Sequence, residues 1–130
     1  MTARLSFVLL ALWVTAAVPG ARAFRSSVST GCVNDTITVD TETLTLSATC
    51  SNGQGGSISS TISLNTCIGN TNGHLTTGEN FSDTCIGITS EGFNMLTGSC
   101  TTLAGTLVQS SIDIDMAFED NNGSLTCATS

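Results

Sequence analysis

The chain has 130 residues, with ten acidic and three basic side chains and a formal net charge of −7. A chain this acidic is repelled by nucleic-acid phosphates and by anionic lipid surfaces, so we expect it to bind neither nucleic acid nor membranes. Most of its polar residues are uncharged Ser, Thr, Asn and Gly, which suits a neutral, hydroxyl-rich ligand better than an ion.

Residues 1–23 have the pattern of a secretory signal peptide. A basic start precedes an apolar run over 5–18, and Ala21-Arg22-Ala23 supplies the small residues of a cleavage site. The run is shorter than the roughly 20 apolar residues of a membrane-spanning helix. We therefore expect a secreted, extracellular protein whose mature chain, 24–130, is one small domain. Arg25 is its only basic residue, so the formal charge becomes 1 − 10 = −9.

Part of the mature chain repeats at a displacement of fifty residues. Cys50 aligns with Cys100, and five further identities keep the same register: Ser60 with Ser110, Ile62 with Ile112, Asn72 with Asn122, Gly73 with Gly123, and Leu75 with Leu125. Because the register holds without a gap, we interpret the chain as a tandem repeat, with copies at about 28–77 and 81–127.

Strand patterns dominate the mature chain. The runs 43–50, 58–64, 96–100 and 108–114 alternate apolar and polar residues with a period of two, as half-buried strands do. Asn-Gly or Gly-Gly pairs at 52–53, 55–56, 72–73 and 122–123 predict tight turns. A single short helical turn is expected, within 115–120. These patterns together predict an all-β protein with short strands.

Six cysteines, all in the mature part, predict a disulfide framework. No two have the C-x-x-C spacing and His74 is the only histidine, so we expect no metal or cofactor. Cys32 and Cys50 of the first copy correspond to Cys85 and Cys100 of the second, so we pair them within each copy. Cys67 and Cys127 remain, and a bond between them would tie the first copy to the end of the second.

These residues resemble the cyanovirin-N homology (CVNH) domain of cyanovirin-type lectins over about residues 28–127. The resemblance rests on Phe81-Ser-Asp-Thr-Cys85 and Val28-Ser-Thr-Gly-Cys32, on the cysteine pairs, and on Asn72-Gly-His-Leu75 and Asn122-Gly-Ser-Leu125. It implies a pseudo-two-fold, disulfide-stabilised, cyanovirin-N-like fold of interleaved repeats.

In such a fold, one half runs from about Cys67 to Met116, and the C-terminal hairpin from Ala117 onward completes the other half. A hinge between the halves permits domain-swapped dimers. The Cys67–Cys127 bond should oppose swapping, so we expect a monomer.

The resemblance also implies non-catalytic binding of glycans, most typically oligomannose, at one site on each end of the molecule. The first site is expected to involve Thr30, Gly31, Ser51, Gly53, Asp120, Asn121, Asn122 and Gly123. The second is expected to involve Asn70, Thr71, Asn72, Glu79, Asn80, Asp83, Thr84, Thr101, Thr102 and Gly105. Carboxylate and amide oxygens can accept hydrogen bonds from sugar hydroxyls, and amide and backbone N–H groups can donate to them.

Other features leave alternatives open. The Asn-Gly pairs are also what tight hairpins require, whether or not a sugar binds. Acceptors for N-glycosylation begin at Asn34, Asn80 and Asn122, which makes the protein a candidate glycoprotein. Glycans on Asn80 and Asn122 would block the second and the first site. The alternative function is therefore a secreted structural or effector scaffold that has lost sugar binding and binds a protein partner.

We do not expect an enzyme. Asp113 and Asp115 share one strand face, as a carboxylate pair in a hydrolase would. Their counterparts Ser63 and Asn65 are not acidic, so we interpret both aspartates as the solvated side of a strand. A Ser or Cys nucleophile would have only His74 as a base.

Overall fold

The computed structural model describes residues 25–92 and 94–129, and the expected signal peptide lies outside them. The described chain consists mainly of short antiparallel strands joined by single helical turns, which confirms the all-β prediction. None of the helices in these ranges has the length and apolar character needed to span a bilayer.

Each sequence copy contributes a three-stranded antiparallel sheet and a hairpin. The first copy supplies β2 (Thr38–Asp40), β3 (Thr45–Ser51) and β4 (Ser57–Ser63), followed by the hairpin of β5 (Ile68–Thr71) and β6 (His74–Thr77). The second supplies β7 (Cys85–Glu91), β8 (Met95–Thr101) and β9 (Leu107–Asp113), followed by β10 (Phe118–Asn121) and β11 (Ser124–Cys127). The N-terminal strand β1 (Arg25–Ser27) pairs with β10.

Four of the five helical turns in the described residues occur at matching places in the two copies, the first with the fourth and the third with the fifth in chain order, while the second has no counterpart. The five turns are α2 (Val28–Gly31), η1 (Asn34–Thr36), η2 (Leu64–Thr66), η3 (Phe81–Asp83) and α3 (Ile114–Ala117). The turn expected within 115–120 is thus α3, which ends at Ala117 because the fully buried Phe118 begins a strand. Leu44 is not in a strand as its alternation predicts, because its φ of 57° places it in a turn before β3.

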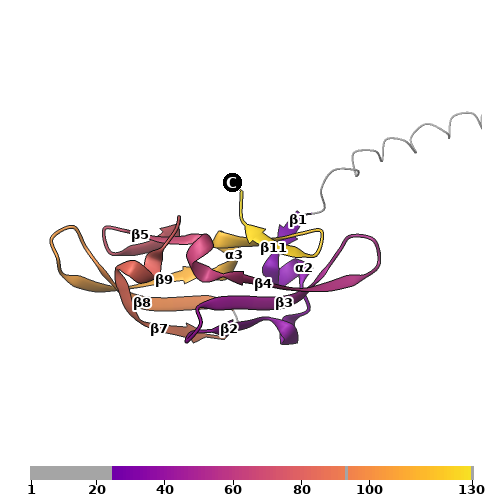
Figure 1. Cartoon of the computed structure of the whole chain (residues 1–130), viewed down its shortest axis with the longest axis horizontal. Coiled ribbons are helices and arrows are strands. Elements are labelled where there is room, and N and C mark those ends of the chain that lie inside the picture. The colour runs from indigo at the N-terminus through magenta and orange to yellow at the C-terminus, as the bar shows by residue number, and fades with distance from the viewer. Residues whose placement is uncertain (1–24, 93, 130) are drawn as a thin grey trace, which may run out of the picture.

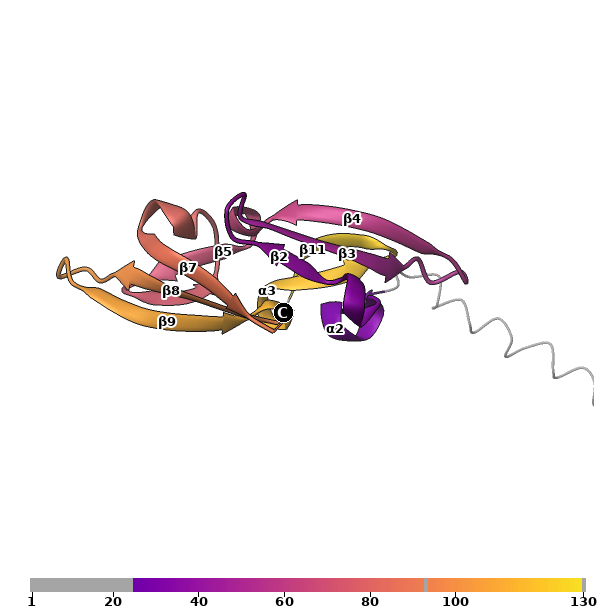
Figure 2. The ribbon, with the colours of Figure 1, turned by 90° about the horizontal axis from the view of Figure 1, so that it is seen from below.

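The copies are interleaved, as the CVNH resemblance implies. The hairpin β5–β6 packs on β9 and β8 of the second copy, and β11 packs on β4 and β3 of the first. Figure 1 shows the resulting elongated molecule, with the β7–β9 sheet at one end and the β3–β4 pair at the other, and Figure 2 shows the same division from below. The half made of β1–β4 and β10–β11 is called the first half here, and the half made of β5–β9 the second half.

Repeated residues meet across this exchange. Leu125 N of β11 donates to Ser60 Oγ of β4 over 2.9 Å, and Leu75 N of β6 donates to Ser110 Oγ of β9 over 2.9 Å. In both bonds, the serine of one copy accepts from the leucine of the other copy, and not from the leucine of its own copy. This explains why both types recur at a fixed displacement.

Alternating strand residues and the cystines form the core. In β3 the buried residues are Leu46, Ala48 and Cys50, and in β8 they are Leu96, Gly98 and Cys100. All six cysteines lie in the described residues and are paired as Cys32–Cys50, Cys85–Cys100 and Cys67–Cys127, which are the pairs that the repeat predicts. The Cys67–Cys127 bond joins the residue before β5 to the end of β11.

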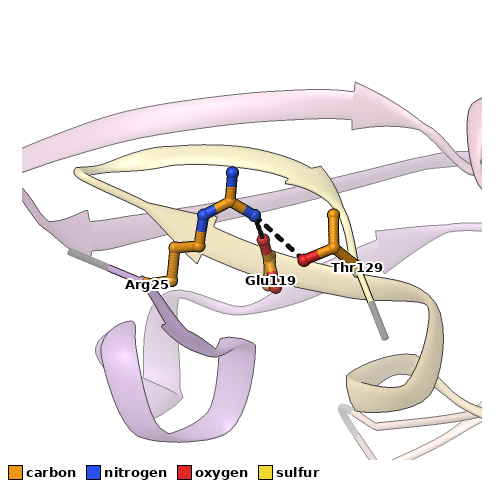
Figure 3. Close-up of polar contacts among 3 residues, drawn as sticks. All are labelled: Arg25, Glu119 and Thr129. Atoms are coloured by element: carbon orange, nitrogen blue, oxygen red, sulfur yellow. Dashed lines mark hydrogen bonds and ion pairs between the residues drawn. The ribbon is translucent and has the colours of Figure 1, made fainter. Parts of the chain in front are cut away.

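Arg25, the one arginine or lysine among the described residues, holds the two described ends of the chain together. Figure 3 shows one nitrogen of its guanidinium joined by dashed lines to Glu119 on β10 and to Thr129. Nη1 donates to Glu119 Oε2, with which it forms an ion pair, and to Thr129 Oγ1 over 3.1 Å. An exposed pair of this kind contributes about 0–1 kcal/mol.

Candidate functional site

At the tip of the second half, Asn70 links three segments of the chain. Its Oδ1 accepts from Gly73 N in the β5–β6 turn over 2.7 Å. Its Nδ2 donates to Thr84 Oγ1 over 2.9 Å and to the Thr101 carbonyl over 3.0 Å. The segments on either side of the Cys85–Cys100 bond are therefore fixed against the turn. Several residues predicted for the second site are thereby brought together.

The β8–β9 loop closes the same tip. Leu103 N donates to Asn72 Oδ1 over 2.8 Å, which binds the loop to the turn. Gly73 has a φ of +90°, and a Cβ there would lie 2.5 Å from Val108 Cγ2 and 2.8 Å from Thr102 Cγ2. Only glycine therefore allows the turn to approach the loop this closely. Gly105 lies farther along the loop, and no atom lies within 4 Å of the place that a Cβ would occupy there.

Exposed polar side chains border this cluster. Those of Thr71, Glu79, Asn80, Asp83 and Thr84 are all exposed. Glu79 and Asp83 lie on either side of Asn80, whose left-handed backbone precedes η3, and η3 packs on β5. Within the described residues, neither the Glu79 nor the Asp83 carboxylate makes a hydrogen bond or ion pair. Both are open to accept bonds from a ligand.

At the tip of the first half, Gly31, Asp120 and Gly123 come together. Gly123 N donates to Asp120 Oδ1 over 2.6 Å, as Gly73 N does to Asn70. Gly123 has a φ of +96°, and a Cβ there would lie 2.9 Å from Ile58 Cδ1 on β4. A Cβ on Gly31 would lie 2.7 Å from Asp120 Oδ2. Helix α2 thus touches the hairpin of the other copy directly.

The remaining residues predicted for the first site lie around this contact. Thr30 Oγ1 accepts from Ser27 Oγ over 2.8 Å, and Ser51 Oγ accepts from Gly53 N over 3.1 Å. Thr30, Gly53 and Asn122 are exposed, while Ser51 and Asn121 are half-buried. This tip therefore also presents hydroxyl, amide and backbone groups to solvent.

Asp120 does not fit the direct ligand contact that we expected for it. Its side chain is fully buried, so its oxygens are not presented to a ligand. Burial raises the pKa of its carboxyl above the usual value, and the bond from Gly123 N is a smaller, opposing cause. From its buried position, Asp120 instead stabilises the turn by accepting the hydrogen bond from Gly123 N.

Sequence reasoning missed residues that shape the tips. Asn52 Oδ1 accepts from Gln54 N over 2.8 Å and from Gly56 N over 3.1 Å, and so fixes the β3–β4 loop. The Asn52-Gly53 pair marked a turn but did not show that its side chain holds the loop. Ser26, opposite Asp120 in the β1–β10 register, gave no signal in the sequence.

The two aspartates considered for hydrolysis have structural partners. Asp113 Oδ1 accepts from Asp115 N over 2.9 Å and so caps α3. Asp115 accepts from Ser29 N over 3.0 Å and from Ser29 Oγ, which joins α3 to α2. Asn65 makes the equivalent pair of bonds with Ser82. In both copies, the side chain at this position of the repeat is therefore hydrogen-bonded to a serine of another helical turn and joins the two turns.

A groove of about 820 Å³ lies near the middle of the molecule, away from both tips. It is lined by β6, the end of β9, α3 and the C-terminal Ala128 and Thr129. None of the residues predicted for sugar binding lines it. Within the described residues, no group of His, Cys, Asp and Glu is arranged to hold a metal ion.

Comparisons with known proteins agree with this architecture. The family model of the CVNH domain matches residues 29–126. The solved structure of TbCVNH from T. borchii is 32% identical, with a TM-score of 0.61 over 79% of this chain and 100% of that one. That of GzCVNH from Gibberella zeae is 25% identical, with a TM-score of 0.62 over 72% and 91%.

Microvirin, in its complex with mannobiose, is 27% identical to the chain, with a TM-score of 0.62 over 78% of this chain and 98% of that one. Curated proteins give no match. The interleaved repeats, the paired turns at the two tips and the extent of these matches lead to one conclusion: the chain belongs to the CVNH domain family.

Proposed function

We propose that the protein is a secreted, non-catalytic lectin that binds oligomannose-type glycans at its two tips. The observation that carries this proposal is the pairing at each tip of a turn from one copy with cystine-flanked segments of the other, bordered by hydroxyl, amide and backbone groups. Such groups supply both the donors and the acceptors that sugar hydroxyls require. The complex of microvirin with mannobiose supports a mannose-type ligand. The signal-peptide pattern and the three disulfides of the described chain support secretion.

The second tip can be tested with Glu79→Ala/Asp83→Ala. Both carboxylates are exposed and form no bond within the described residues, so their removal should leave the fold intact. Bonds from hydroxyls to carboxylates contribute about 1.5 kcal/mol or more each, so mannobiose affinity at this tip should fall at least about tenfold. The measurement is an NMR titration with mannobiose that follows the Gly73 amide.

Asp35→Ala/Glu42→Ala is the matched control, because it removes the same charge from exposed positions outside both tips. Equal loss of affinity in both double variants would assign the effect to net charge and count against a sugar site at the second tip. Maltose serves as the control ligand.

The alternative function, a scaffold that binds a protein, is favoured by one observation. Asn34, Asn80 and Asn122 all have exposed side chains, and two of them lie at the candidate sites. We compare unglycosylated protein from bacteria with material from a eukaryotic secretory host, whose chain should begin at Phe24. If only the unglycosylated form binds mannobiose, the sugar sites exist and are blocked by N-linked glycans on the protein itself. If neither form binds mannobiose, the lectin proposal is overturned and the scaffold function is favoured.

A further inference from the structure

At one position of the repeat, the two tips carry chemically different side chains, an amide at the second tip and a carboxyl at the first. Asn70 and Asp120 lie fifty residues apart, and each accepts a hydrogen bond from the glycine of its turn, over 2.7 and 2.6 Å. Asn70 also has an amide nitrogen, which donates to Thr84 Oγ1 and to the Thr101 carbonyl. An ionised aspartate at the same place has no hydrogen to donate.

The surroundings of Asp120 leave polar atoms unsatisfied. Asp120 Oδ2 and Ser26 Oγ are both buried and, within the described residues, have no hydrogen-bond partner. Both crowd the point where a Cβ on Gly31 would lie. Gly31 stands just before Cys32 as Thr84 does before Cys85, so the hydroxyl that receives the bond from Asn70 is absent here. Ser26 brings a hydroxyl to that place from β1.

Among the described residues, no charge on the elements packed against β10 offsets a negative charge on Asp120. On β1 and β10, Arg25 and Glu119 pair with each other, and strand alternation places them on the face opposite to Ser26 and Asp120. Asp115 of α3 is bonded to Ser29. The other elements packed on β10, α2 and β11, carry no titratable side chain apart from the bonded Cys127. A carboxylate buried with a single N–H donor is unfavourable.

We propose that Asp120 holds the first tip together as a neutral carboxylic acid, with its Oδ2 proton directed toward Ser26 Oγ, and that this makes the first tip a proton-dependent latch. In its neutral form Asp120 has a donor, as Asn70 has. When the proton is lost, the hairpin that carries Asn121–Gly123 is held less firmly. This inference rests on the proposed function only in its consequence that the first sugar site weakens at neutral pH and the second does not.

The sign of the pH dependence follows from the direction of the pKa shift. Burial raises the pKa of folded Asp120 above its unfolded value of about 3.9. The stability that the neutral acid contributes is therefore fully present below about pH 4. It is lost as the pH rises through the raised pKa of the folded state.

NMR on the labelled protein tests the latch directly. The Asp120 carboxyl carbon should titrate with a midpoint above the ordinary aspartate value of about 3.9. The Gly123 amide should shift with it, while the Gly73 amide, which bonds to Asn70, should not. A midpoint at or below the ordinary value would overturn the proposal, because the Ser26 hydroxyl would then be donating to an ionised carboxylate.

Two reciprocal substitutions supply a second readout. Asp120→Asn should raise Tm at pH 7, and its advantage over the wild type should disappear below about pH 4. Asn70→Asp, which builds an acid into the second tip, should lower Tm at pH 7 and recover part of the loss on acidification. An Asp120→Asn advantage that is equal at both pH values would refute a proton-dependent role.

These measurements use no sugar, so they stand apart from the failure or success of the lectin proposal. Mannobiose titration adds the functional arm. Its affinity at the first tip, followed at Gly123, should be higher at about pH 4 than at about pH 7.5, whereas the second tip, followed at Gly73, should show no such gain on acidification. Equal pH dependence at the two tips would contradict the link between the latch and the first site.

Discussion

A few side-chain groups hold each hairpin against the sheet of the other copy. Ser60 and Ser110 do so by accepting from the backbone N–H of Leu125 and Leu75, whereas Asn70 and Asp120 accept from the glycines of their own hairpin turns. Leu75 and Leu125 are themselves buried. Each hydroxyl or carbonyl oxygen therefore satisfies a backbone donor that would otherwise be buried without a partner.

Removing one of these hydroxyls should cost much more than removing an exposed one. Ser60→Ala leaves Leu125 N without its acceptor, and the free energy of unfolding should fall by about 1–3 kcal/mol. Ser57→Ala, at an exposed position on the same strand, should change it by less than about 0.5 kcal/mol. Urea unfolding of both variants measures the difference. Similar values for both would show that the Leu125 bond contributes little.

The glycine turns are the elements that let the hairpins approach the sheets. Gly73 and Gly123 both have positive φ, and both lie under a β-branched side chain of the other copy, Val108 or Ile58. The sequence predicts the turns from the Asn-Gly pairs alone. Glycine is needed here for more than the positive φ of the turn, because side chains of the other copy also occupy the space where a Cβ would be.

Two substitutions separate the backbone cost from the packing cost. Gly105→Ala, at a φ of +88° with nothing within 4 Å, carries only the left-handed cost of about 1–2 kcal/mol. Gly73→Ala adds the overlap with Val108 and Thr102, so its loss of stability should exceed that of Gly105→Ala by about 1–3 kcal/mol. Thermal and urea unfolding provide the comparison. Equal losses would mean that the loop moves aside freely.

The whole molecule depends on exchange between the copies, and the Cys67–Cys127 bond fastens that exchange. The bond spans 60 residues, whereas Cys32–Cys50 spans 18. Without the bond, the C-terminal hairpin is held to the first half by packing and hydrogen bonds. The same contacts can be made to a second chain, which is the basis of domain swapping.

Cys67→Ala/Cys127→Ala should therefore change both stability and association. The loop-closure estimate predicts a loss of about 4 kcal/mol for a separation of 60, against about 3 kcal/mol for Cys32→Ala/Cys50→Ala. Only the first double variant should form dimers at high concentration. Denaturant unfolding and size-exclusion chromatography give the two readouts. A Cys67→Ala/Cys127→Ala variant that stays monomeric at millimolar concentration would contradict the role of the bond against swapping.

The sequence by itself determined the repeat, the all-β class, the turns and the cystine pairs, because these depend on short-range patterns and on a register that compares the chain with itself. The exchange of hairpins was implied only by the family resemblance, and the tertiary structure identified the contacts that make it, since Ser60 and Leu125 meet only through long-range packing. The tertiary structure also decided the roles of single residues: Asp120 is fully buried and Leu44 lies in a turn, although both occur in patterns that read as exposed turn and strand. Alternation along a strand indicates its buried face, but the burial of a polar residue such as Asp120 depends on everything that packs around it, and no local pattern in the chain encodes it.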